Sequence, residues 1–245
     1  RWFSDLSGII VGSSAVALAV TAEAIYAQLA VRRILRGILS KENVSEQVTR
    51  KSFIRFYLPL AITPLASLLI HPVGSAGMSR MPEALPSLAA WPVVYGLVFI
   101  TRSLGFAFNE VVVALLPHPN GKLELLRFTR ILAISTSAFL GVLALTPIGG
   151  YWFLYVAGLS EELAYISSTT LVFAILMPGY QAYQAWYSGL LVNKNLTNGI
   201  SFAVLIYAII AIIGLWIGTR LATFPGIYWA VNVFVFAGLS QTLYL

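Results

Sequence analysis

Long apolar runs joined by short polar links restrict the fold of this chain more than any other feature. Seven runs are long enough to cross about 30 Å of hydrocarbon. They lie near residues 6–31, 53–78, 86–116, 127–147, 163–192, 199–218 and 224–245. Charged residues make up 10% of the chain, against about a quarter in soluble domains.

Backbone groups in lipid must bond internally, and the run Leu205–Ile213 lacks the alternation of a membrane strand. We therefore predict an all-α polytopic membrane helix bundle of about seven transmembrane helices.

The basic residues lie mostly in the links, and they predict the orientation of the spans. Links on one side carry Arg32, Arg33, Arg36, Lys41, Arg50, Lys51, Arg55, Lys122, Arg127, Arg130 and Lys194. Links on the other side carry Arg1, Arg80 and Arg220. The positive-inside rule makes the 32–55 link cytoplasmic. We expect an integral protein of a bacterial plasma membrane, with the lipid bilayer as a partner and no nucleic acid.

Two charged residues lie inside the third run. Arg102 is far from either end of the run. At the centre of a membrane helix a charge costs about 2.5–3.5 kcal/mol even on insertion scales. Glu110 follows eight residues later, about 12 Å along the helix and turned by about 80°. We expect both residues, with Asn109, to line one wall of a cavity. A structural ion pair, or snorkelling toward the cytoplasmic end, is the alternative.

Prolines interrupt two of the runs and indicate candidate hinges. The second run contains Pro59, Pro64 and Pro72, and the fifth contains Pro178. Proline removes a backbone donor and kinks a helix, and broken helices are where transporters bend and bind. A static kink is the alternative. We expect His71, beside Pro72, to be an interfacial histidine rather than a proton site.

A polar and aromatic stretch follows Pro178 in the fifth run. Gln181 and Gln184 are i, i+3 neighbours on one face, and Tyr187 follows them. Such a face suits binding of an amphipathic ligand, so these three residues are candidate cavity-lining residues. The same face equally suits hydrogen bonding between helices, which is the alternative.

Sequence tests for an enzyme fail. Asp5 is the sole aspartate, cysteine is absent, and the chain has no GxSxG, P-loop or HExxH motif. We expect no catalytic residue, no metal site and no cofactor. A membrane-embedded enzyme acting on a lipid substrate and a non-transporting scaffold subunit are the alternative functions.

Four stretches carry a resemblance to a known family. They are PLAITPLASLLIHPVGSAGMSR (59–80), SLAAWPVVYGLVFITRSLGFAFNEVVVALL (87–116), VAGLSEELAYISSTTLVFAILMPGYQAYQAWYSGLLVNKNLTNG (156–199) and FPGIYWAV (224–231). In order and spacing they resemble the C-terminal lobe of MATE-like transporters, the superfamily of multidrug exporters and oligosaccharide-lipid and polysaccharide flippases. The resemblance implies that 1–39 is the last helix of a preceding N-terminal lobe. It also implies that 40–52 is a cytoplasmic inter-lobe linker and that 53–245 is a six-helix C-terminal lobe.

This resemblance implies a secondary transporter, an exporter or flippase that works by alternating access. The N-terminal lobe, missing here, would be its partner, so we expect the chain to be a piece of a longer protein. Sodium-coupled members carry an acidic residue in the first and in the fourth helix of this lobe. This chain has no acidic residue between residues 53 and 78, and its fourth lobe helix has Gln181 and Gln184 instead. The resemblance therefore does not identify a coupling ion, whether sodium or proton. An amphipathic, anionic or lipid-linked substrate fits Arg102 and Glu110 best.

Overall fold

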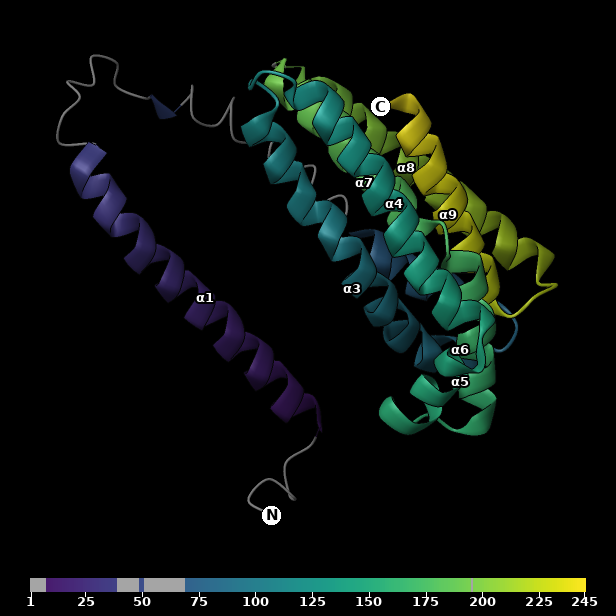
Figure 1. The fold of residues 1–245 in the computed structure, drawn as a ribbon. Coiled ribbons are helices and arrows are strands. Elements are labelled where there is room, and N and C mark those ends of the chain that lie inside the picture. Colours follow the sequence, from purple (N-terminus) through teal and green to yellow (C-terminus); the bar gives the residue numbers. More distant parts are fainter. Residues whose placement is uncertain (1–7, 39–48, 51–68, 195) are drawn as a thin grey trace. The chain divides into compact units, whose positions relative to one another are not determined.

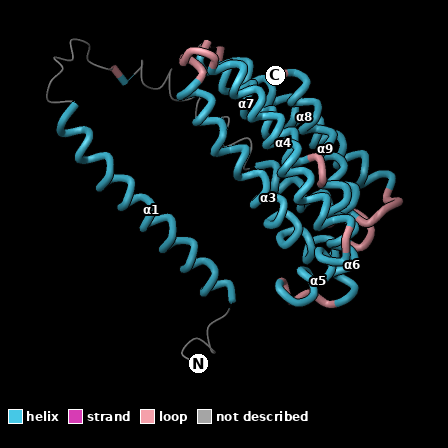
Figure 2. Tube along the Cα trace, in the orientation of Figure 1, coloured by secondary structure: helices cyan, strands magenta, loops and turns pink. Residues whose placement is uncertain are grey.

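The computed structural model describes residues 8–38, 49–50, 69–194 and 196–245. The chain divides into two compact units, Arg1–Ile54 and Arg55–Leu245, which we describe separately. The described residues form helices joined by turns, with no strand among them (Figure 2).

The first unit contains helix α1, Gly8–Ile38 (Figure 1). Its alanine-rich sequence favours a helix, because alanine loses no side-chain entropy there. The span Ile10–Arg32 has a mean hydropathy of 1.6 and no buried residue. An apolar helix of this length is typical of a membrane span.

The second unit begins, among its described residues, with a helical segment at 69–78. The elements that follow are α3 (Ala84–Leu115), α4 (Gly121–Leu145), α5 (Pro147–Tyr151), the π-helix η1 (Trp152–Val156), α6 (Glu161–Ala174), α7 (Met177–Asn193), α8 (Thr197–Leu221) and α9 (Gly226–Tyr244). The α3–α4 and α7–α8 turns lie at one end of this unit with the C-terminus, and α5 lies at the other end (Figure 1).

The described residues contain six helices long and apolar enough to cross a membrane, and α6 and α7 count together as one span of 33 residues. This confirms the predicted all-α membrane bundle. The second predicted run, 53–78, lies largely outside the described residues, and its last ten residues are helical. Pro59 and Pro64 lie outside the described residues as well. Helix α4 begins at Gly121, earlier than predicted, because a helix continues through polar turns beyond the lipid.

The fifth predicted run is broken where its proline lies. Pro178 is in the first turn of α7, where the missing N–H costs nothing. Ile175 ends α6 with a 3.5 Å bond from its N–H to the Val172 carbonyl. At the other end of α6, Ser160 accepts a hydrogen bond of 3.4 Å from the Leu163 N–H. Ser160 is therefore the N-cap of α6.

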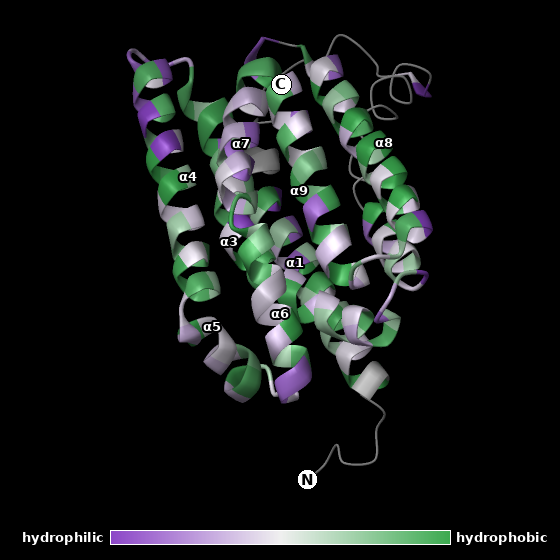
Figure 3. Ribbon diagram, turned by 90° about the vertical axis from the view of Figure 1, so that its right-hand side faces the viewer, coloured by the Kyte–Doolittle hydropathy of each residue, from purple (hydrophilic) through white to green (hydrophobic). Residues whose placement is uncertain are grey.

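Small residues let the helices of the second unit approach closely. A Cβ on Gly105 of α3 would lie 2.7 Å from Gln181 Cγ of α7, and one on Gly189 would overlap Val112. Lipid tails are as apolar as the side chains of the helices, so the hydrophobic effect does not drive membrane helices together. They associate through close packing of this kind. The outward surface stays apolar: α8 has a mean hydropathy of 2.7 with 17% of its span buried. Most of the α8 ribbon has the green colour of hydrophobic residues in Figure 3.

Candidate functional site

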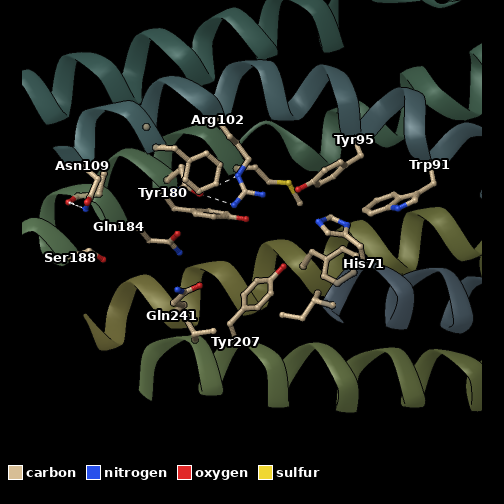
Figure 4. Close-up of a pocket in the computed structure, with 18 residues that line it drawn as sticks. His71, Trp91, Tyr95, Arg102, Asn109, Tyr180, Gln184, Ser188, Tyr207 and Gln241 are labelled. Atoms are coloured by element: carbon tan, nitrogen blue, oxygen red, sulfur yellow. Dashed lines mark hydrogen bonds between the residues drawn. The ribbon is translucent and has the colours of Figure 1, made fainter. Parts of the chain in front are cut away.

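A cavity of about 300 Å³ opens inside the second unit. Residues from the 69–78 segment and from α3, α7, α8 and α9 line it (Figure 4). It extends along α3, from Asn109 at one end, past Arg102, to Trp91 at the other. These three residues are seven and eleven positions apart, which is close to whole turns of a helix, so they share one face.

Arg102 lies at the middle of the cavity and is half-buried. Its Nε and Nη2 donate hydrogen bonds of 3.2 and 2.7 Å to Oε1 of Gln181. Its guanidinium carbon lies 5.6 Å from the ring centre of Phe106 and 5.9 Å from that of Tyr180, within cation–π range. The described lining contains no Asp or Glu. The guanidinium charge therefore has a neutral amide and two rings as its described neighbours.

One end of the cavity is lined by uncharged polar side chains. Asn109 Nδ2 donates to the Ala185 carbonyl at 3.1 Å. Gln184 Nε2 donates at 3.0 Å both to the Gly238 carbonyl and to Thr242 Oγ1. These bonds fix the two amides, whose oxygens remain as acceptors. Ser188 and Gln241 add further polar groups at this end (Figure 4).

The other end of the cavity is aromatic. The His71 ring lies edge-on to Tyr95, with 4.3 Å between ring centres, and Trp91 lies 5.4 Å from Tyr95. Trp91 also packs against Phe234 of α9 at 5.6 Å. Mutual packing of this kind holds the rings in fixed orientations. The cavity thus changes from amide-lined to cationic to aromatic along its length.

Four residues singled out from the sequence meet in this cavity: Arg102, Asn109, Gln181 and Gln184. Arg102 and Asn109 belong to α3, and Gln181 and Gln184 belong to α7. These two helices pack side by side. Gly105 allows the close approach that brings Gln181 to Arg102, because any Cβ there would collide with Gln181.

Two expected cavity residues lie elsewhere. Glu110 is exposed and is not part of the lining, because its position on α3 is turned by about 80° from that of Arg102. Tyr187 is half-buried and stacks on Tyr183, with ring centres 6.5 Å apart. Both differ from the prediction that they face the cavity.

The two described candidate hinges differ in their surroundings. Pro72 is exposed on the 69–78 segment. Pro178 is buried at the break between α6 and α7, next to the lining residue Met177.

Sequence reasoning missed the aromatic end of the site. His71, expected at the membrane interface, lines the cavity with Trp91, Tyr95 and Tyr207. A signal existed on α3, since Trp91 and Tyr95 share the helical face of Arg102. No comparable signal pointed to Tyr207 or Gln241, which α8 and α9 bring to the site.

Among the described residues, no group of three or more His, Cys, Asp or Glu side chains could hold a metal ion. No protein-family model, curated protein or solved structure matches this chain. The geometry of the cavity is therefore the ground on which a function can be argued.

Proposed function

We propose that this chain is part of a secondary membrane transporter, a MATE-like exporter or flippase. It moves an amphipathic or anionic small molecule, or a lipid-linked substrate, by alternating access. The observation that carries the proposal is a cavity among membrane-spanning helices that contains Arg102 without a carboxylate in its described lining.

Arg102 places a positive charge among membrane-spanning helices. A charge at membrane depth is tolerated where it meets a partner charge, water or a ligand. Gln181 provides hydrogen bonds but no charge. A bound anion would supply the missing charge, and a guanidinium is suited to carboxylate or phosphate groups.

The remaining features of the cavity support a binding role. Its volume of about 300 Å³ is at the small end of ligand sites, which commonly combine apolar walls with a few placed polar groups. Binding between helices at mid-span is the usual arrangement in secondary transporters. The partners of the chain in this proposal are the bilayer, the substrate and an N-terminal lobe that completes the second wall. The 32–55 link would face the cytoplasm of a bacterial cell.

Thiol labelling tests the proposal, because these 245 residues contain no cysteine and any cysteine outside them can be replaced by serine. Ser188 lines the cavity, and Ser188→Cys changes one atom. In the whole protein we expect a membrane-impermeant maleimide to modify this variant in both right-side-out and inverted vesicles. Ser167→Cys is the matched control, since Ser167 is fully buried and lies outside the cavity lining.

Three outcomes would contradict the proposal. Labelling of Ser188→Cys from neither side would mean a dry cavity. Labelling from one side alone would mean a fixed vestibule rather than alternating access. A steady ionic current through the same membranes would indicate a channel.

A further inference from the structure

A second hollow lies beside the cavity, on the membrane-spanning helix α3. It has a volume of about 480 Å³, and its described lining consists of His71, Trp91, Pro92, Tyr95, Gly96 and Phe99. We call it the α3 groove. Phe99 is 46% exposed and Pro92 is exposed as well, so the groove is open along the outer side of the helix. The described lining carries no charged side chain apart from the ionisable ring of His71.

The α3 groove and the cavity share a wall. His71, Trp91 and Tyr95 line both hollows. Phe99 continues this aromatic wall, with its ring centre 6.2 Å from Tyr95 and 6.1 Å from Phe106. Phe106 in turn packs on the Arg102 guanidinium. An unbroken row of rings therefore runs from the groove to the charge.

The two hollows differ in chemistry in a way that matches the two parts of one molecule. The cavity supplies the Arg102 guanidinium, a cation that binds an anionic group. The groove supplies aromatic and aliphatic surface that binds an apolar group. A ligand with its anionic group at Arg102 would place a chain attached to that group against Tyr95 and Phe99.

We propose that the α3 groove holds the apolar part of the ligand whose anionic group binds at Arg102. The ligand is thus an anionic amphiphile, with a single charged head and an apolar tail that leaves the cavity sideways past Tyr95. This inference rests on the proposed function of the cavity and adds the chemical class of its substrate.

Gly96 offers a way to fill the groove without a clash with any described atom. Among the described residues, no atom lies within 4 Å of a Cβ built at this glycine. A Gly96→Trp side chain would occupy the groove, whereas Gly12→Trp on α1 adds the same ring at another glycine whose Cβ would meet no described atom within 4 Å.

The experiment measures binding of methyl phosphate and hexyl phosphate by titration calorimetry, with the whole protein in phosphatidylcholine nanodiscs. Both probes are water-soluble, so burial of the hexyl chain is measured against water. Burying one CH₂ raises affinity about fourfold, and we expect hexyl phosphate to bind at least tenfold tighter than methyl phosphate. Gly96→Trp should abolish this advantage and leave methyl phosphate unchanged, while Gly12→Trp should keep both affinities.

The outcomes separate failure of the groove from failure of the cavity. If methyl phosphate binds, and binds less to Arg102→Gln, but chain length has no effect, the groove inference is wrong and the cavity stands. If methyl phosphate does not bind at all, the proposed anion site is wrong.

Phe99→Ala is a second variant, which removes groove surface without filling it. It should reduce the ratio of hexyl phosphate affinity to methyl phosphate affinity at least threefold. An unchanged ratio would overturn the inference. Nanodiscs with one fifth phosphatidylglycerol should give the same affinities. Loss of methyl phosphate binding there would mean that bilayer phospholipid occupies the site.

Discussion

Arg102 donates both of its described hydrogen bonds to a single acceptor, Oε1 of Gln181. An amide in this position fixes the direction of the guanidinium and leaves its charge intact. A carboxylate would make the same two bonds and cancel the charge. Gln181 therefore controls whether the middle of the cavity is cationic.

The Gln181→Glu variant tests this role with almost no change in shape. A carboxylate beside Arg102 competes with any bound anion, so we expect methyl phosphate affinity to fall at least tenfold, measured by calorimetry in nanodiscs. Gln241→Glu is the control: it adds the same charge to the lining but has no described bond to Arg102, and its effect should be smaller. Equal effects of the two variants would refute a specific role for Gln181.

The packing of α3 on α7 depends on where glycine is present. Gly105 and Gly96 both lie in α3, but Gly105 is in close contact with α7 and Gly96 is not. A Cβ on Gly105 would lie 2.7 Å from Gln181 Cγ and 3.2 Å from the Gln181 backbone, whereas one on Gly96 would meet no described atom within 4 Å. Gly105 thus sets the distance between the helix that carries Arg102 and the helix that carries Gln181.

Alanine substitution at the two glycines should give opposite results. We expect Gly105→Ala to lower the free energy of unfolding by about 1–3 kcal/mol, because overpacking forces the helices apart. Gly96→Ala should leave stability unchanged or raise it by up to about 1 kcal/mol through helix propensity. Thermal unfolding midpoints in one detergent provide the comparison. A Gly105→Ala variant as stable as Gly96→Ala would show that the close contact is absent.

At the scale of the second unit, the break at Pro178 matters for topology. Helices α6 and α7 together form one candidate span of 33 residues, in spite of the break between them. Lys122 lies in the first turn of α4 and Lys194 follows α7, so two spans separate these lysines. Both are exposed, and both should lie on the cytoplasmic side by the positive-inside rule.

Single-cysteine labelling in inverted and right-side-out vesicles checks this arrangement. We expect Lys122→Cys and Lys194→Cys to react in inverted vesicles, where the cytoplasmic face is outside. Arg220→Cys, one span further along the chain, should react in right-side-out vesicles. Labelling of the two lysine positions from opposite sides would mean that α6 and α7 do not act as one span.

The sequence by itself determined the membrane class, the helical fold and the position of the break at Pro178. These follow from local physics: the length of apolar runs, internal backbone bonding in lipid and the missing N–H of proline. It also identified Arg102, because an intramembrane charge is costly wherever it lies.

The tertiary structure decided what surrounds that charge. The partnership of Gln181 with Arg102 and the contribution of His71 and Tyr207 depend on how helices distant in the chain approach each other. Helical period separates faces of one helix, but it does not say which face of a second helix packs against them. Close contacts such as that of Gly105 with Gln181 fix this arrangement, and no pattern within a single run encodes them.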